Sequence, residues 1–169
     1  MNLIFDVETT GLNPDMDEIL QFSAIDENYN VLFNSYIRPT APFNQTWPNA
    51  ERIHGITPDI VKDSPTFDDV REQIQALFDK ADLLIAYNGI FDIKFLSSLI
   101  HGIKIPDVPC HDVMLEFAPI FGEYDSFYCN FKWQKLKTAA EFYGYKFQAH
   151  DSLEDVKATL YVFDKMRMR

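Results

Sequence analysis

Two acidic residues, Asp6 and Glu8, stand two positions apart at the end of the apolar run that opens the sequence. In a β-strand this spacing places both carboxylates on one face, where their negative charges repel each other. A divalent cation held by oxygen ligands would compensate the repulsion, so the pair indicates a metal site. The alternative is an ordinary strand end that is open to solvent. Directly after the pair, Gly11 permits a tight turn that exposes backbone N–H groups.

Four further residues have side chains suited to catalysis, but each also has an ordinary structural explanation. Asp92 lies in the first turn of a predicted helix, where the helix dipole favours an acid whether or not it binds a metal. Asp155 opens the last predicted helix, where it resembles part of a capping box. His150 and His54 are also compatible with plain loop or packing histidines. Taken singly, none of these residues predicts an activity.

As a set, these residues match a known pattern. Segments 5–12, 88–96 and 150–159 resemble, in order and in local spacing, the three exonuclease motifs of the DEDD superfamily, in its histidine-containing branch. Segment 53–57 is similar to a further segment that is often found between the first two motifs. The family includes the proofreading subunit of bacterial DNA polymerase III, ribonuclease T and oligoribonuclease. The resemblance covers nearly the whole chain.

The resemblance implies an enzyme that removes nucleotides one at a time from the 3' end of a strand. Asp6, Glu8, Asp92 and Asp155 would hold two divalent ions, with Asp6 bridging both. Oxygen ligands and octahedral preference favour Mg²⁺ or Mn²⁺. Two such ions stabilise the attacking and leaving oxygens of a phosphodiester. His150, whose ordinary pKa is about 6.5, would act as the general base toward the attacking water.

The same resemblance implies a pocket for the terminal nucleotide. The residues that would line it are Thr9, Thr10, Gly11, Leu12, His54, Asn88 and Phe91. A terminal nucleotide is unpaired and stacked on apolar side chains at modest cost, so the expected substrate is single-stranded or frayed DNA. The product would be a nucleoside 5'-monophosphate. The sequence departs from the family at Tyr87, where His is frequent, and at Ser152, where Ala is frequent, but neither position is a family metal ligand.

Three other functions match parts of the sequence. An exoribonuclease would use the same motifs, because they concern phosphates and metals and do not read the sugar. A catalytically silent docking module of a replication complex is favoured by the acidic surface and by the aromatic-rich segment 117–131, but the complete acid set argues against it. A phosphatase with an aspartyl nucleophile would have a second Asp two residues after the first. Glu8 occupies that position, so the sequence disfavours this chemistry. The sequence leaves open whether the enzyme works alone or with a DNA polymerase or another replication or repair protein.

The composition predicts one globular domain over residues 1–169, with a net charge of -11. That charge opposes nucleic-acid binding, but it is unevenly distributed: residues 1–131 hold 21 acidic and 7 basic residues, and residues 132–169 hold 5 acidic and 8 basic ones. Bound cations would reduce the need for basic side chains, and lysines near the C-terminal end are candidates for phosphate contacts: Lys132, Lys135, Lys137 and Lys146. The sequence contains no signal peptide or membrane span, which predicts a cytoplasmic location.

The spacing of apolar residues predicts an α/β fold. The predicted strands are 2–7, 18–26, 31–38, 83–87 and 108–113, and the predicted helices are 67–80, 90–100, 133–143 and 153–166. Residues 39–66 are rich in Pro, Asn and Thr, which predicts short helical turns and a functional loop. Three antiparallel strands followed by a parallel crossover give a mixed five-stranded sheet flanked by helices. This order agrees with the ribonuclease H-like fold that the resemblance implies.

Overall fold

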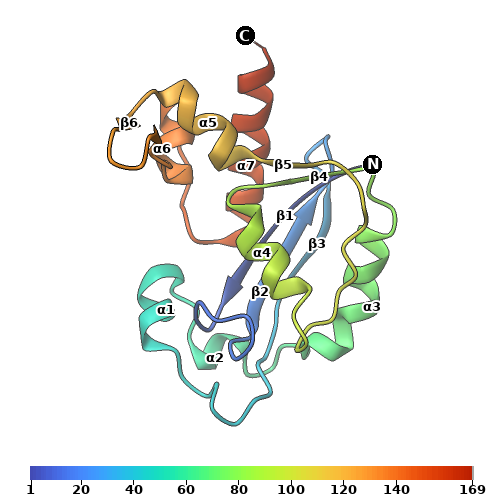
Figure 1. Ribbon diagram of the computed structural model, residues 1–169. Helices are drawn as coiled ribbons and strands as arrows, with labels where there is room; N and C mark the ends of the chain where they lie inside the picture. Colours follow the sequence, from blue (N-terminus) through green and yellow to red (C-terminus); the bar gives the residue numbers. More distant parts are fainter. Residues whose placement is uncertain (169) are drawn as a thin grey trace.

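The centre of the molecule is a five-stranded sheet with the strand order β3-β2-β1-β4-β5 (Figure 1). The computed structural model describes residues 1–168, and Arg169 of the expected domain lies outside the described residues. The strands are β1 (Asn2–Thr9), β2 (Ile19–Ile25), β3 (Val31–Tyr36), β4 (Leu83–Ala86) and β5 (Cys110–Asp112). β1, β2 and β3 pair antiparallel, whereas β4 pairs parallel with β1 and with β5. The predicted mixed five-stranded sheet is therefore confirmed.

Helices cover the sheet and form the segments that connect its strands. They are α1 (Pro48–His54), α2 (Pro58–Val61), α3 (Phe67–Phe78), α4 (Gly89–Leu96), α5 (Val113–Phe121), α6 (Leu136–Phe142) and α7 (Ser152–Arg167). Thr66 caps α3 with a capping box, because its side chain accepts a hydrogen bond from Asp69 N–H while the Asp69 side chain accepts one from Thr66 N–H. The short turns expected in residues 39–66 are α1 and α2. Within residues 1–168, no helix is long and apolar enough to cross a membrane.

Two elements were not predicted: helix α5 and the hairpin of β6 (Tyr124–Asp125) and β7 (Asn130–Phe131). Pro119 argues against a helix in its segment, but it lies close to the end of α5, where few helical hydrogen bonds remain to be lost. The side chain of Asp112 caps the start of α5 by accepting from Met114 N–H. The hairpin strands are too short for an alternating pattern to be recognised.

Alternation along β1 divides its side chains between two hydrophobic layers. Leu3, Phe5 and Val7 pack on the face that α3 covers. Ile4 packs on the opposite face, in a cluster to which α5, α6 and α7 contribute. Because side chains alternate with period 2, Asp6 and Glu8 point to the same face as Ile4, toward α7. The core therefore fixes the direction in which both acids point.

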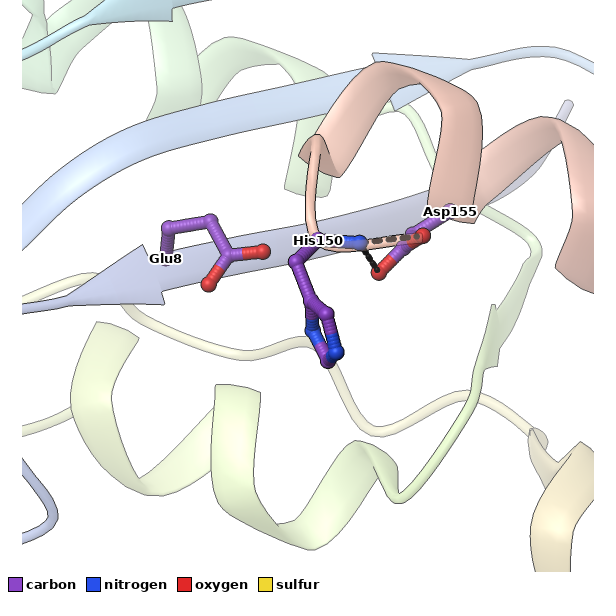
Figure 2. A group of neighbouring side chains, drawn as sticks. All are labelled: Glu8, His150 and Asp155. Carbon is purple, nitrogen blue, oxygen red and sulfur yellow. Dashed lines mark hydrogen bonds between the residues drawn. The ribbon is translucent and has the colours of Figure 1, made fainter. Parts of the chain in front are cut away.

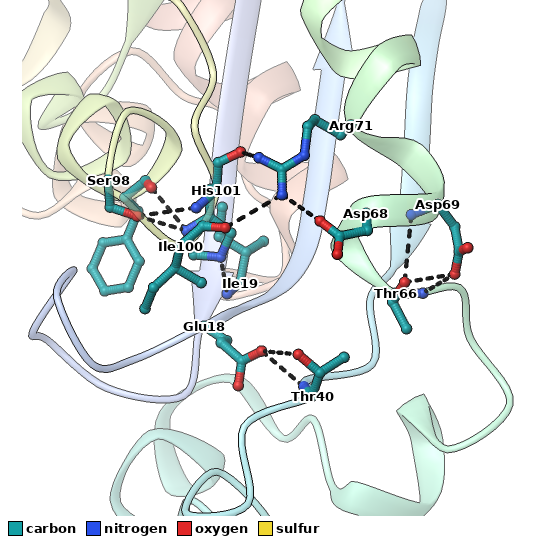
Figure 3. A network of polar contacts seen from close by, with 11 residues as sticks. Glu18, Ile19, Thr40, Thr66, Asp68, Asp69, Arg71, Ser98, Ile100 and His101 are labelled. Carbon is teal, nitrogen blue, oxygen red and sulfur yellow. Dashed lines mark hydrogen bonds and ion pairs between the residues drawn. The ribbon is translucent and has the colours of Figure 1, made fainter.

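Two buried polar groups tie the loops around β2 together (Figure 3). The Glu18 carboxylate accepts hydrogen bonds from Thr40 N–H at 2.8 Å and from Ala41 N–H at 3.0 Å, and these bonds help to lower the pKa of Glu18 although burial opposes them. His101 Nε2 accepts from Ile19 N–H at 3.2 Å, so its Nδ1–H is the donor to Phe95 O. Burial lowers the pKa of His101 to about 4, which keeps the ring neutral. Both groups are structural and hold residues 39–47 and the end of α4 against the sheet.

Candidate active site

The C-terminal half of β1 leaves one edge free for a side chain. β4 pairs with Asn2, Leu3 and Ile4, so the backbone N–H of Val7 lies beyond the end of this ladder. After β4 the chain turns at Asn88, whose φ of 63° is left-handed, and enters α4. Asp92 in the first turn of α4 then accepts a hydrogen bond from Val7 N–H at 3.0 Å. This bond fixes the second motif against the first.

The start of α7 carries the third motif. Asp151 is the N-cap, and its side chain accepts from Glu154 N–H at 3.1 Å, so a capping box of Ser152 and Asp155, the ordinary structural explanation for Asp155, does not form. The carboxylate of Asp155 instead accepts from the backbone N–H of His150, at 3.2 Å and 3.3 Å. His150 has a φ of 71°, a conformation that His tolerates better than most residues. The turn before α7 therefore places His150 and Asp155 side by side.

Glu8, His150 and Asp155 form a compact cluster in which one ligand atom from each residue lies within 4.8 Å of the others. Figure 2 shows the Glu8 carboxylate, from β1, directed toward His150, and the main-chain nitrogen of His150 bonded to Asp155. Burial lowers the pKa of His150, and the positive charge of Lys135 lowers it further. The ring is therefore neutral at neutral pH and has a lone pair available to accept a proton.

Asp6 lies at the centre of the acidic residues. Its Oδ2 is buried and has no hydrogen-bond partner among residues 1–168. Burial raises the pKa of Asp6 well above its ordinary range, and the neighbouring charges of Asp92, Glu8 and Asp155 raise the same pKa further. The alternative of a strand end open to solvent is therefore excluded.

The other three acids share this environment. Burial is the largest cause in each case, and it raises the pKa of Glu8 to about 8, that of Asp92 to about 8 and that of Asp155 to about 7. In the part of the chain that the structure describes, no lysine or arginine forms an ion pair with any of the four carboxylates. Four convergent oxygen donors without a compensating cation, one of them with an orphaned buried oxygen, fit a divalent metal site.

A pocket of about 490 Å³ opens beside this cluster. Six of the seven residues predicted to bind the terminal nucleotide line it, together with Glu8: Thr9, Thr10, Gly11, Leu12, His54 and Phe91. Asn88 lines a neighbouring cavity, which it shares with Leu12 and Phe91. The opposite wall was not predicted and comes from α1 and the residue before it: Trp47, Asn49, Ala50 and Ile53. The sequence signals for this wall were the Pro-rich, Asn-rich composition of residues 39–66 and the resemblance of segment 53–57, which includes Ile53.

The floor of the pocket is held by backbone hydrogen bonds. His54 Nδ1 accepts from Ile56 N–H at 3.0 Å, so its Nε2–H donates to the carbonyl of Thr9 at 3.2 Å. The hydroxyl of Thr9 donates to Gly11 O at 2.6 Å, which leaves its lone pairs as acceptors. A Cβ at Gly11 would lie 2.3 Å from Oδ2 of Asp17, so a larger residue would displace this carboxylate, which accepts a hydrogen bond from Asn13 N–H at 2.8 Å. These contacts join α1 to the end of β1 and give the pocket a fixed shape.

A buried hydrogen-bond network fixes the start of α7 to β2. Ser152 is fully buried, and its Oγ lies 2.5 Å from Ser23 Oγ. Ser23 donates its single hydroxyl proton to Asn34 Oδ1 at 2.9 Å, so Ser152 must be the donor to Ser23. Ser152 N–H also donates to Gln21 Oε1 at 3.4 Å. Asp155 lies one helical turn after this anchor.

We expect Ser152→Ala to lower the free energy of unfolding by about 1 kcal/mol, because it removes one buried hydrogen bond. Urea denaturation in EDTA, which removes any contribution from bound cations, measures this change. Ser126→Ala in the exposed hairpin is the control and should stay within about 0.5 kcal/mol of the wild type. Equal midpoints for Ser152→Ala and the wild type would show that the network does not stabilise the fold.

Comparison with known proteins identifies the family. The exonuclease family model RNase_T matches residues 3–163. The chain belongs to this exonuclease family. It is thus a nuclease of the DEDD superfamily, as the motifs predicted, and its mixed sheet is the ribonuclease H-like fold of such exonucleases.

Individual relatives support this assignment. The chain is 30% identical to a PolC-type DNA polymerase III of Caldanaerobacter subterraneus, over 97% of this chain but only 11% of the polymerase. It is also 30% identical to the uncharacterized exonuclease CP81 of Escherichia phage 186, over 97% of this chain and 87% of the phage protein. Among solved structures, E. coli exonuclease I in complex with single-stranded DNA superposes with a TM-score of 0.77 at 22% identity, over 99% of this chain and 40% of that chain. This exonuclease domain therefore spans a small part of the polymerase and less than half of exonuclease I.

Proposed function

We propose that this exonuclease removes nucleotides from the 3' end of single-stranded or frayed DNA and releases nucleoside 5'-monophosphates. The observation that carries the proposal is the convergence of Asp6, Glu8, Asp92 and Asp155, with His150, beside a pocket lined by the predicted substrate residues. A pocket of this size accepts one end of a chain better than a continuous duplex. The proposed reaction is therefore exonucleolytic hydrolysis, one nucleotide at a time.

In this proposal Asp6, Glu8, Asp92 and Asp155 hold two divalent cations, Mg²⁺ or Mn²⁺. The acids supply the hard oxygen ligands that these ions prefer, and the burial that raises their pKa values makes uncompensated negative charge costly. When bound, such a pair of cations stabilises the charge that develops on the attacking and leaving oxygens of a phosphodiester. The Val7 N–H bond fixes Asp92, and the His150 N–H bond fixes Asp155.

His150 acts as the general base in the proposed mechanism. Its ring is neutral because burial and Lys135 lower its pKa, and it lies beside the Glu8 and Asp155 oxygens. A neutral imidazole at this place accepts a proton from a water molecule that attacks the phosphorus. The hydrogen bond of its backbone N–H to Asp155 holds the residue in position.

The terminal nucleotide occupies the pocket between the end of β1 and α1. Thr9 is the residue best placed to accept a hydrogen bond from a terminal 3'-hydroxyl, because its own proton is donated to Gly11 O. Leu12, which is 83% exposed, and Phe91 offer apolar surface for stacking of the base. His54 supports this surface through its bond to the Thr9 carbonyl.

DNA is proposed as the substrate because the relatives include a DNA polymerase, and because the similar fold of exonuclease I was solved with single-stranded DNA. A DNA polymerase or another replication or repair protein is the corresponding proposed partner, and proofreading or repair is the corresponding role. The complete acid set disfavours a catalytically silent docking module. An exoribonuclease remains an outcome of the experiment below, because the site contacts phosphates and metals and reads no sugar.

The test uses purified protein with Mn²⁺ and a 5'-labelled single-stranded DNA oligonucleotide. We expect stepwise shortening from the 3' end, release of 5'-monophosphates and complete inhibition by EDTA. An RNA oligonucleotide of the same sequence, assayed in parallel, distinguishes the two sugars: faster cleavage of RNA would reassign the substrate. If neither oligonucleotide is shortened, or if EDTA has no effect, the proposed function is wrong.

A further inference from the structure

A second concentration of aromatic side chains lies outside the pocket that receives the terminal nucleotide. Residues 124–133, here named the aromatic hairpin, contain β6, β7 and the residue pair that follows them. Phe127 is 84% exposed, Tyr128 76% and Trp133 64%. Single exposed aromatics are common on protein surfaces, but several on one short hairpin form an apolar patch that indicates a binding site.

The hairpin is built to hold these rings away from the core. The Asp125 carboxylate accepts from Phe127 N–H at 2.9 Å and from Tyr128 N–H at 3.3 Å, which fixes the turn. The rings of Tyr124 and Phe131 pack edge to face across the two strands, 5.4 Å apart. A cavity of about 700 Å³ lies against the hairpin, lined by Tyr128, Phe131 and Trp133 among others. The aromatic-rich segment 117–131, which favoured a docking module, is not exposed along its whole length. Phe117 at its start is fully buried in the core, whereas the exposed rings lie in the hairpin.

The aromatic hairpin is connected directly to the active site. The hydroxyl of Tyr87, which follows β4, donates to Gln134 O at 2.8 Å. Lys135, the next residue, is the N-cap of α6 and so lies directly beside this contact. From Phe131 to Lys135 the chain spans at most roughly 13 Å. A strand with its 3' end in the active site thus reaches the hairpin within a few nucleotides.

The lysines at the start of α6, directly after the aromatic hairpin, suit contact with the phosphates of a nucleic acid. Lys135 and Lys137 are exposed, and within the described residues neither forms an ion pair. Lys132 is instead paired with Glu123 at 2.9 Å. In a chain with a net charge of -11, two lysines without ion pairs at the start of α6, directly after an aromatic patch, are a local exception. Lysines that contact phosphates next to aromatic rings that stack bases are the typical combination for single-stranded nucleic acid.

We propose that the aromatic hairpin is a stacking platform for unpaired bases upstream of the nucleotide being removed, with Lys135 and Lys137 contacting the intervening phosphates. The proposal rests on the proposed function, because it assumes that a 3' end occupies the active site. Stacking requires exposed base faces, so the platform takes a single strand and excludes a paired duplex. It makes long single strands better substrates than phosphodiesters that have no upstream base.

The experiment compares the wild type with two variants, Phe127→Ala/Tyr128→Ala and Trp133→Ala. Binding of a fluorescent oligothymidylate of about 16 nucleotides is measured by anisotropy in EDTA, where no cleavage occurs. In Mn²⁺, kcat/KM is measured for the same oligonucleotide and for the p-nitrophenyl ester of thymidine 5'-monophosphate, which has no upstream base. Tyr36→Ala, an exposed aromatic on β3 at the opposite edge of the sheet, is the matched control.

We expect each hairpin variant to bind the oligonucleotide at least about fivefold more weakly, which corresponds to the loss of one stacked base. The ratio of kcat/KM for the oligonucleotide to that for the ester should fall by a similar factor, and Tyr36→Ala should match the wild type. Unchanged binding and an unchanged ratio would overturn the platform, as would a wild type that does not bind the oligonucleotide; the hairpin would then be a surface for a protein partner. A wild type that binds the oligonucleotide but cleaves neither substrate contradicts the proposed function alone.

Discussion

Replacing Asp6 by Asn is expected to lower exonuclease activity by at least about 10³-fold, equivalent to roughly 4 kcal/mol of transition-state stabilisation. The substitution keeps the shape of the side chain but removes the charge of the residue that lies among all the other acids of the site. The measurement is the rate of single-nucleotide release from a labelled DNA oligonucleotide at saturating Mn²⁺. Glu154→Gln is the matched control, because Glu154 is also an acid in the first turn of α7 but pairs with Lys157 at 2.8 Å.

The same substitution should change how stability depends on pH in EDTA. Glu8 and Asp92 have pKa values of about 8 in the folded protein, above their ordinary values near 4. Groups with a raised folded pKa stabilise the fold fully below the unfolded pKa, and this stabilisation is lost as pH rises toward the folded pKa. The wild type without metal is therefore expected to lose thermal stability between about pH 5 and 8.

Asp6→Asn removes one negative charge from the cluster, so the loss of stability between pH 5 and 8 should be smaller than in the wild type. At pH 8, Mg²⁺ should raise the melting temperature of the wild type and of Glu154→Gln, but have little effect on Asp6→Asn. An Asp6→Asn protein that retains both wild-type activity and wild-type stabilisation by Mg²⁺ would show that the acidic cluster is not the metal site.

The motif residues could be placed from the sequence because local rules determine their directions. Alternation along β1 predicts that Asp6 and Glu8 share a face, and the core at Ile4 then determines which face it is. Helix starts after β4 and before α7 predict that Asp92 and Asp155 lie in first helical turns. Their convergence on one point did not follow from spacing alone, but from the resemblance of the three segments to a known set of motifs.

Contacts between distant segments account for most of what was missed. The network of Ser152, Ser23 and Asn34 joins three elements, and nothing in the sequence near Ser152 indicates its partners. The wall that α1 adds to the pocket beside the acidic cluster depends on Trp47, whose Nε1–H donates to Ile56 O at 2.7 Å and holds the two ends of this segment together. Composition predicted a functional loop there but could not say which side chains face the pocket.

A second large loss of activity is expected when His150 is replaced. This substitution separates the contribution of proton transfer from that of metal binding. His150→Asn should lower the rate of nucleotide release by about 10²- to 10⁴-fold, the usual contribution of a general base. Asn is the chosen replacement because it tolerates the left-handed backbone that His150 adopts, so the turn and its N–H bond to Asp155 remain. His111→Asn, at a histidine outside the site that bonds to Glu116 at 2.5 Å, is the control.

The pH profile decides whether His150 transfers the proton. Because its pKa is lowered below the ordinary value of about 6.5, the wild-type rate should stay high at neutral pH and fall only as the ring becomes protonated under more acidic conditions. This acidic limb should disappear in His150→Asn, while Mg²⁺ still raises the melting temperature at pH 8, because the four carboxylates are intact. A residue that only supported the fold would lower the rate at all pH values alike. Retention of the same acidic limb in His150→Asn would show that the limb does not report protonation of His150 and that another group accepts the proton.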